Sequence, residues 1–214
     1  MTLQNVIDLA KNGPLKNVAI KNDAEAIVGY VNLGLIELYK RFAIDTEEVV
    51  ITIGSDGDNL NKYTKISDTI YQMPDDFMYL ISAYGEIVSI SQDMATFLPI
   101  NEEDNPLGIN TISWNKVQIP IATTGAHISL IYASAPQYFT SDDLAETIPL
   151  PVQLIEPLVE YLGYQGRSSI NAAEQETNIQ YQRFETSCLK VRELGIFTTD
   201  DLDMHGRWAG LGFA

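Results

Sequence analysis

The hydrophobic period of this chain changes twice, and the two changes limit the folds that it can adopt. Apolar residues recur at helical spacing up to about residue 42, alternate with a period of two from about residue 47 to 134, and return to helical spacing after residue 151. Helices and strands bury residues at different spacings, so each stretch fits one kind of element. This order predicts an α+β protein, with a bundle of N- and C-terminal helices and an inserted antiparallel β-sandwich or barrel-like domain.

Two helices are expected in the N-terminal part. The first begins near Leu3 and ends at Gly13-Pro14, and the second runs from about Asp23 to Phe42, with Asn22 or Asp23 as its N-cap. The apolar stripe of the second helix comprises Ile27, Val28, Val31, Leu35, Leu38 and Phe42. Gly29 and Gly34 lower its helix propensity by roughly 1 kcal/mol each, so packing must hold it. The glycines also leave room for another helix to approach closely.

The middle of the chain is rich in short runs of β-branched and aromatic residues. We expect strands at 49–53, 69–72, 78–83, 87–90, 111–114, 117–119 and 128–133. The pair Asn115-Lys116 is expected to form a tight hairpin turn between two of them. Short strands at hairpin spacing are typical of a small antiparallel sandwich or barrel.

Helical spacing returns after Pro151, in two helices expected from about Val152 to Ser169 and from an N-cap at Asn171 to about Leu194, ended by Gly195. The stripe of the last helix, at coiled-coil-like spacing, comprises Thr177, Tyr181, Phe184, Cys188 and Val191. We therefore expect a helical bundle domain from residues 1–45 and 148–195, an inserted β domain at 46–147 and an extended C-terminal tail at 196–214.

The chain is strongly acidic, with 29 acids against 13 bases and a formal net charge of -16. Such a surface attracts neither nucleic acid nor an anionic membrane, because both bind through Lys and Arg. The N-terminus lacks a basic region followed by an apolar run, and no stretch approaches the roughly 18 apolar residues of a membrane span. We expect a protein that is made in a cytoplasm or carried within a particle.

No metal site is predicted from the sequence. The single Cys188 excludes an internal disulfide and a Cys-based zinc site, and its helical context indicates a buried small residue. The run Asp56-Gly57-Asp58-Asn59 invites a calcium interpretation, but Leu60 and Asn61 occupy the positions where an EF-hand needs an oxygen ligand and a glycine. A turn between strands is the better interpretation.

No catalytic or cofactor site is predicted either. The histidines, His127 and His205, have no Ser, Cys or second His at a known catalytic spacing, and His205 lies near acids that are better interpreted as a solvated segment. The pairs Asp75-Asp76 and Asp142-Asp143 are expected to cap turns, because general acid–base catalysis would need one acid buried and shifted in pKa. The chain contains no P-loop and no G-x-G-x-x-G or G-x-S-x-G motif.

Four segments, in this order, carry a resemblance to a known family. They are residues 30–39 (YVNLGLIELY), 73–81 (MPDDFMYLI), 128–136 (ISLIYASAP), and 148–151 (IPLP) with 155–162 (IEPLVEYL). Together they resemble the head-to-tail adaptors, or connectors, of short-tailed bacteriophages, related to the tail tubular protein A group. The likeness spans about residues 2–191. Gly34 departs from the pattern, since the family commonly has alanine at that position of the first motif.

The resemblance implies a structural protein of the virion that forms a dodecameric ring at the head-tail junction. Such a ring binds the portal protein and the tail nozzle protein, and genomic DNA passes through its lumen without specific binding. Two other functions stay open: a different neck or tail-completion protein, and an acid-dependent hydrolase.

The tail at 196–214 carries a separate hypothesis about partner binding. Phe197, Trp208, Leu211 and Phe213 are apolar side chains in a glycine-rich segment too short to form its own core. They are expected to anchor in grooves of a neighbouring subunit or of the portal, as aromatic hot spots do. Packing of this tail against its own bundle is an equal alternative.

Overall fold

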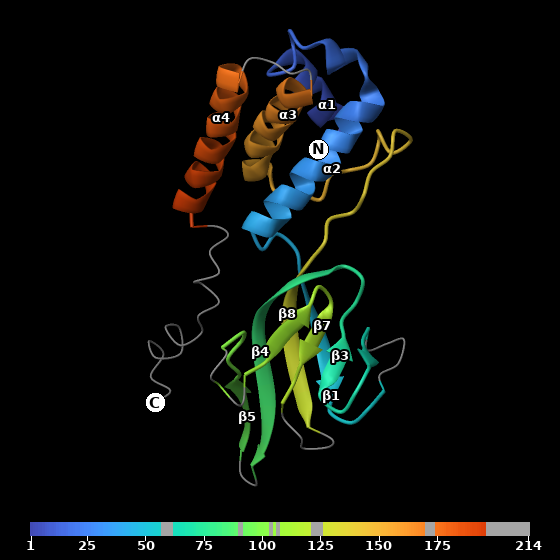
Figure 1. Ribbon diagram of the computed structural model, residues 1–214, viewed down its shortest axis with the longest axis vertical. Helices are drawn as coiled ribbons and strands as arrows, with labels where there is room; N and C mark the ends of the chain where they lie inside the picture. The colour runs from blue at the N-terminus through green and yellow to red at the C-terminus, as the bar shows by residue number, and fades with distance from the viewer. Residues whose placement is uncertain are drawn as a thin grey trace. The chain divides into compact units, whose positions relative to one another are not determined.

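The computed structural model describes residues 1–56, 62–89, 92–102, 105, 108–120, 126–169 and 174–195. Within them the chain forms two compact units, the helical unit of residues 1–44 and 136–195 and the β unit of residues 45–135. The described residues contain four α-helices and two antiparallel sheets, an α+β protein, with the elements labelled in Figure 1.

The helical unit contains α1 (Leu3–Asn12), α2 (Ala24–Arg41), α3 (Ile155–Ser169) and α4 (Glu174–Glu193), with short 3-10 helices η1 (Ala19–Asn22) and η2 (Val152–Leu154). Asp23 is the N-cap of α2, as predicted, and its carboxylate accepts a hydrogen bond from the backbone nitrogen of Ala26 at 3.0 Å. The expected helix from Val152 begins as 3-10 helix and becomes α-helix at Ile155. Asn171, the expected N-cap of the last helix, lies outside the described residues.

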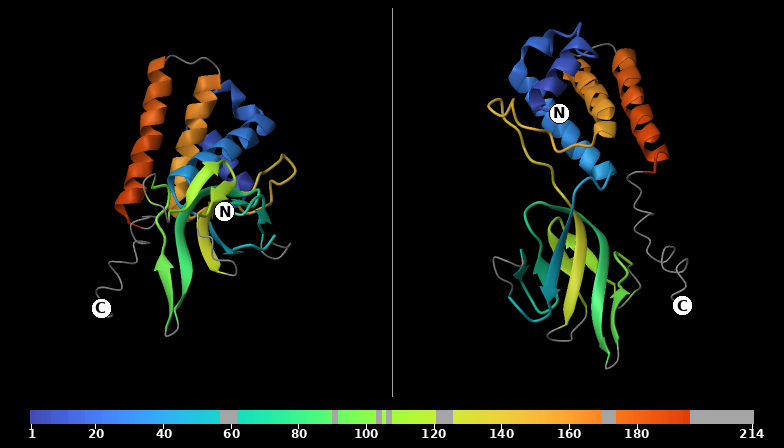
Figure 2. Two further views of the ribbon diagram at one scale, coloured as in Figure 1. Left: turned by 60° about the horizontal axis from the view of Figure 1, so that its bottom comes forward. Right: turned by 180° about the vertical axis from the view of Figure 1, so that it is seen from behind.

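Helix α3 packs against α1, α2 and α4, and Figures 1 and 2 show it between α2 and α4. Gly34 permits the close approach of α2, because a Cβ there would lie 2.6 Å from Cδ1 of Leu158 and 3.1 Å from Cδ1 of Tyr161. The prediction of a close helix contact is thus confirmed for Gly34. It is wrong for Gly29, where a Cβ would meet nothing within 4 Å.

The core of the helical unit draws on each of its α-helices. Its buried residues include Leu3, Val6, Ile7, Ala10, Ile27, Val31, Leu35, Leu38, Leu158, Leu162, Phe184, Cys188 and Val191. Tyr181, expected in the stripe of the last helix, is 39% exposed, while Gln180 and Ser187 are buried on that helix. The buried side of α4 therefore includes polar residues that the apolar stripe omitted.

The segment 136–147 packs on the helical unit, although we expected it within the β domain. The backbone nitrogen of Leu3 donates to the carbonyl of Glu146 at 2.9 Å, and that of Gln4 donates to Leu144 at 3.0 Å. Phe139 is buried in the helical core. Backbone pairing with the start of α1 and one buried ring explain why this segment belongs with the helices.

The β unit contains two sheets whose neighbouring strands are antiparallel. The first has the order β1 (Thr46–Thr52), β8 (His127–Ser134), β4 (Phe77–Ser89), β5 (Gln92–Phe97). The second has the order β2 (Thr64–Lys65), β3 (Ile70–Gln72), β7 (Lys116–Gln118), β6 (Asn110–Ser113). Both sheets have free outer strands among the described residues, so the barrel alternative of our prediction is wrong.

Two strand predictions need correction. The runs 78–83 and 87–90 were expected as separate strands but belong largely to one strand, β4, which continues through Gly85. The predicted hairpin between β6 and β7 is confirmed, but its turn is Trp114-Asn115, one residue earlier than expected. Strands β2 and β5 were not predicted.

One apolar cluster takes side chains from both sheets. It includes Val49, Ile51, Tyr71, Leu80, Ala83, Val117, Ile128, Leu130 and Tyr132. In β1 the buried residues alternate with more exposed ones, as the period of two predicts. Tyr71 fixes the chain after β1, because its hydroxyl accepts a hydrogen bond from the backbone nitrogen of Gly54 at 3.2 Å.

Candidate functional site

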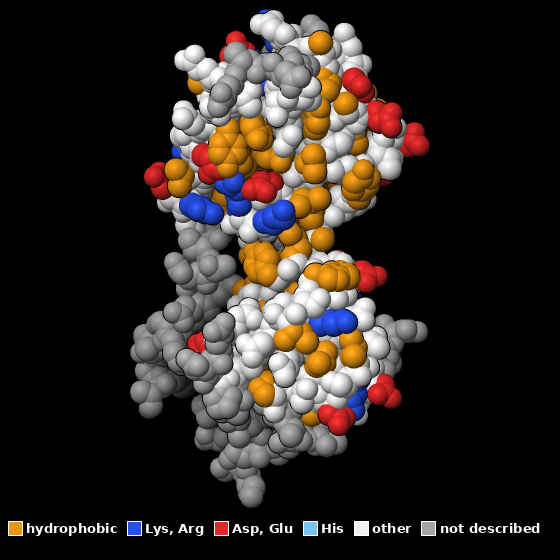
Figure 3. All heavy atoms as spheres, in the orientation of Figure 1, with side chains coloured by type: hydrophobic (Ala, Val, Ile, Leu, Met, Phe, Trp, Pro, Cys, Tyr) orange, Lys and Arg blue, Asp and Glu red, His pale blue; other side chains and the backbone are white. Residues whose placement is uncertain are grey.

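Exposed apolar side chains lie at several separate places on the two units. On the helical unit they include Leu9 of α1, Leu33 and Ile36 of α2, and Leu189 of α4, each between 36% and 55% exposed. On the β unit, Trp114 of the β6–β7 turn is 67% exposed. Figure 3 shows apolar side chains on one face of the helical unit, with charged side chains among them. Single exposed apolar side chains are common on protein surfaces, whereas Leu33 and Ile36 lie one turn apart on α2 and together mark a candidate contact surface.

An aromatic cluster lies where α2, α3 and α4 meet. Tyr161 packs edge-to-face on Phe184 with ring centroids 5.1 Å apart, and Tyr164 lies 5.1 Å from Tyr181. Burial raises the pKa of the Tyr161 hydroxyl, which accepts a hydrogen bond from Gln165 at 2.9 Å. Tyrosines of this kind present a large apolar surface with a polar edge, as contact residues commonly do.

Arg41 connects this cluster to two carboxylates. Its guanidinium lies 4.7 Å from the centroid of the Phe184 ring. It contacts both oxygens of Glu185, at 2.9 and 2.8 Å, and Oε1 of Glu37 at 2.8 Å. The bond to Glu185 is the largest cause of the raised pKa of Arg41 and of the lowered pKa of Glu185. Because its contacts are made within the subunit, Arg41 holds α2 and α4 together rather than offering a free charge.

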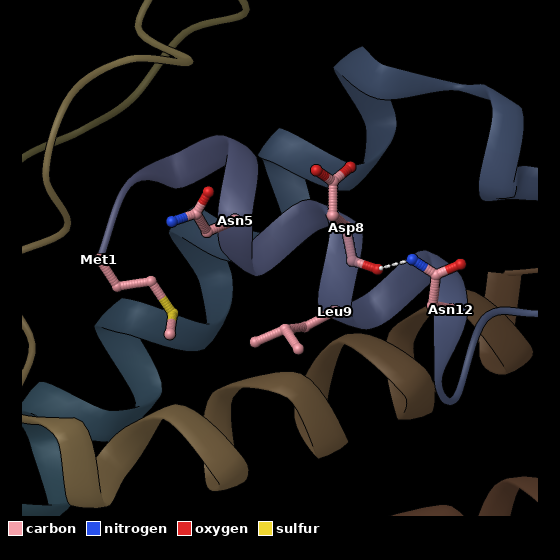
Figure 4. Close-up of a pocket in the computed structure, with 5 residues that line it drawn as sticks. All are labelled: Met1, Asn5, Asp8, Leu9 and Asn12. Carbon is pink, nitrogen blue, oxygen red and sulfur yellow. Dashed lines mark hydrogen bonds between the residues drawn. The ribbon is translucent and has the colours of Figure 1, made fainter.

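A hollow of about 300 Å³ lies against α1, lined by Met1, Asn5, Asp8, Leu9 and Asn12. Figure 4 shows the side chains of Met1 and Leu9 pointing toward one another, and Asn12 donating to the backbone oxygen of Asp8 at 2.9 Å. Asp8 is the one titratable side chain in this lining. The hollow therefore suits an apolar side chain of a partner better than a reaction needing an acid and a base.

A second hollow, of about 310 Å³, lies between α3 and α4 and is lined by residues of both charges. Glu156 faces Lys190 at 3.8 Å across it, and Ile179 is exposed in its lining. The carboxylate of Glu160 accepts a hydrogen bond from Gln180. Glu156, Arg183 and Lys190 are exposed and Glu160 is half-buried, so this hollow has no buried charge in its lining.

Two of the acids singled out in the sequence, Asp76 and Asp143, form hydrogen bonds within the fold. Asp76 and Glu47 both lie within hydrogen-bond distance of the Tyr132 hydroxyl, at 3.2 and 3.3 Å. Burial and these two charges raise the pKa of Tyr132, and the ion pair with Lys62 lowers the pKa of Glu47. Asp143 accepts hydrogen bonds from the backbone nitrogen and the hydroxyl of Thr140, both at 2.7 Å, which lowers its pKa and confirms its predicted role in a turn.

Four kinds of candidate from the sequence remain: the two histidines, Cys188, the acidic turn and the tail residues. His127 is exposed, with its Nδ1 3.1 Å from the hydroxyl of Thr52. Cys188 is buried, as predicted, and burial raises the pKa of its thiol to about 11. His205, residues 57–59 and the four tail residues Phe197, Trp208, Leu211 and Phe213 lie outside the described residues. Within the part that is described, no group of three His, Cys, Asp or Glu side chains could hold a metal ion.

None of the helices in the described ranges combines the length and the apolar composition that crossing a membrane requires. Comparison of the sequence with models of known protein families found no match, and a search among curated proteins found none either.

Proposed function

We propose that this chain is a non-enzymatic structural protein of a bacteriophage particle, a head-to-tail adaptor that forms a ring between the portal and the tail nozzle. Its place is the head-tail junction of the virion, and it is assembled in the host cytoplasm. The likeness of residues 30–39, 73–81, 128–136, and 148–151 with 155–162, to connector proteins of short-tailed phages supports this proposal.

The observation that carries the proposal is the separation of the exposed apolar patches. A subunit of a closed ring contacts its two neighbours through two different surfaces, and it needs further surfaces for the proteins above and below. The patches at Leu9, at Leu33 with Ile36, at Leu189 and at Trp114 lie on different elements. A ring subunit of about twelve copies needs several contact surfaces, and these exposed apolar side chains offer candidates for them.

The hydrolase alternative is less well supported. A general acid must hold its proton near neutral pH, which requires a raised pKa. Glu47 does not meet this requirement, because the ion pair with Lys62 lowers its pKa; its carboxylate and that of Asp76 both lie within hydrogen-bond distance of the Tyr132 hydroxyl. The same two carboxylates therefore serve the fold of the β unit in this account.

The net charge of -16 fits a conduit for DNA. A negative surface disfavours binding to phosphates, so DNA passes through the lumen without specific contacts. Screening by salt confines this effect to a distance of about 8 Å at physiological ionic strength, so only charges on the lumen wall act on the DNA.

The finer architecture belongs to the same proposal. The helices act as a bundle that makes the ring contacts, and the two sheets, which share one apolar cluster, act as a sandwich. The extended tail at 196–214 docks through Phe197, Trp208, Leu211 and Phe213. A variant truncated after Gly195 is expected to lose portal binding, and normal binding by that variant would defeat the docking role of the tail.

The test is electron cryo-microscopy of the purified protein mixed with the portal protein of the same phage. Rings of twelve copies attached to the portal are expected. Rings of six would favour the tail-completion alternative, and a monomer that ignores the portal would reject the proposal. Leu189→Asp is expected to weaken the ring if α4 contributes to it, whereas Gln182→Asp, an exposed polar position on the same helix, is the matched control.

A further inference from the structure

Helix α2 carries an exposed row of residues on the side that faces away from the core. This α2 row consists of Glu25, Gly29, Leu33, Ile36 and Lys40, whose spacing of four, four, three and four places them on one face. Leu33 is 47% and Ile36 is 36% exposed, and a Cβ at Gly29 would meet nothing within 4 Å. The row is thus an apolar strip with a gap at Gly29 and an exposed charge at each end.

The two charges have opposite sign and are free to act outside the subunit. Glu25 and Lys40 are both exposed. None of the ion pairs between described residues involves either of them. A partner that covers the row must therefore supply a positive group near Glu25, a negative group near Lys40 and a bulky apolar group at Gly29.

A second copy of the same helix supplies all three when it lies antiparallel. In such a pair, residues whose numbers have the same sum lie at the same level along the two helices. When the two residue numbers at each level add up to 65, Glu25 of one copy lies opposite Lys40 of the other, and Gly29 lies opposite Ile36. Leu33 then lies beside the two-fold axis, next to Leu33 of the second copy.

A parallel pair would not match in this way. Like charges would meet at both ends, and the two Gly29 positions would face one another and leave a gap. Like charges that lie directly opposite destabilise a helix pair, and an unfilled gap loses contacts. The self-complementarity of the α2 row is therefore specific to the antiparallel arrangement.

We propose that the free protein pairs with a second copy of itself through the α2 row in an antiparallel, two-fold contact. One pair of helices buries less than the roughly 1,200 Å² of a stable interface, so the dimer is weak and reversible. A two-fold contact does not by itself close a ring. It therefore differs in symmetry from the ring contacts proposed above, and before assembly it covers the apolar surface at Leu33 and Ile36 that is exposed for contacts in the ring.

Disulfide trapping tests the geometry. Leu33→Cys is expected to form a covalent dimer under mild oxidation, because the two positions meet at the axis. Leu9→Cys, at 46% exposure on α1, is the matched control and should remain monomeric. The native Cys188 is buried in both variants and does not compete. Equal crosslinking of the two variants, or none for Leu33→Cys at high concentration, would overturn the proposal.

Charge exchange tests the direction of the pair. Glu25→Lys and Lys40→Glu are each expected to raise the dissociation constant of the dimer about tenfold, because two like-charge pairs replace two opposite-charge pairs. The double variant should return to within about twofold of the wild type by sedimentation equilibrium. A double variant as weak as the single ones would refute the antiparallel pair. If Leu33→Cys subunits form rings on the portal but do not crosslink when they are free, the α2 contact is refuted and the adaptor function stands.

Discussion

The side chain of Asn32 forms two hydrogen bonds with the backbone of Phe139, 107 residues further along the chain. Its amide nitrogen donates to the carbonyl oxygen at 2.8 Å, and its oxygen accepts from the backbone nitrogen at 2.9 Å. Asn32 is only 4% exposed. One buried amide thereby attaches the segment 136–147 to α2 and satisfies both backbone groups of Phe139.

Replacing this amide should destabilise the helical unit. Asn32→Leu is expected to lower the free energy of unfolding by about 2 to 4 kcal/mol, because it leaves a buried donor and a buried acceptor unsatisfied. Urea denaturation followed by circular dichroism measures the change. Asn12→Leu is the control, since Asn12 is exposed, and its effect should stay within about 0.5 kcal/mol. Equal effects of the two substitutions would show that the contact with Phe139 is not stabilising.

Two glycines of α2 should respond in opposite directions to the same substitution. Gly34→Ala places a methyl group 2.6 Å from Cδ1 of Leu158, and the overpacking cost of about 1 to 3 kcal/mol should outweigh the gain of about 0.5 to 1 kcal/mol in helix propensity. Gly29→Ala meets open space and should add about 0.5 to 1 kcal/mol of stability through helix propensity. Thermal unfolding of the two variants measures both effects. A stabilising Gly34→Ala would contradict the close approach of α2 and α3.

The pair Arg41 and Glu185 predicts a dependence of stability on acid. The pKa of Glu185 is lowered from its ordinary value of 4.5 by the hydrogen bond from Arg41. A carboxyl group whose pKa is lower in the folded state stabilises the fold above its unfolded-state pKa, and this contribution is lost as pH falls through the folded-state pKa. Wild type should therefore lose more stability than Glu185→Gln on acidification from pH 6 to pH 3.

At pH 7 the same substitution should cost about 1 kcal/mol, since the pair is partly screened by solvent. Glu156→Gln is the comparison, because Glu156 meets Lys190 at 3.8 Å with both side chains more than 60% exposed. Its effect should be close to zero at every pH. If the stability of the two variants depended on pH in the same way, the contact of Arg41 with Glu185 would not stabilise the fold.

Cys188 should be unreactive in the folded protein. Its thiol is buried, and that burial raises its pKa to about 11, so both access and the thiolate fraction are low at pH 8. Labelling with iodoacetamide should be slow in buffer and fast in denaturing urea. Fast labelling of the native protein would mean that the contact of α4 with the core is weaker than its burial implies.

The sequence was most informative where a local pattern decides the structure. Helix α2 differs from its predicted range by one residue at each end, because its stripe and the N-cap Asp23 are local signals. It was least informative where distant contacts decide. No periodicity marks Phe139, whose burial depends on Asn32 of another element.

The apolar pattern of the sequence also did not predict which polar residues are buried or where the candidate contact surfaces lie. Gln180 and Ser187 of α4 are buried because Gln180 bonds to Glu160 and the hydroxyl of Ser187 donates to the carbonyl of Phe184. An apolar stripe cannot indicate such residues. The sequence pattern did not indicate the α2 row, because its members are a mixture of charged residues, a glycine and two apolar residues. The exposure of Leu33 and Ile36 in the structure identifies it.

The number of copies per portal ring tests the central claim most directly. Native mass spectrometry of the complex with the portal protein of the same phage should give twelve copies of this chain on each portal ring. A portal mass that stays unchanged at a large excess of the chain would contradict the adaptor function.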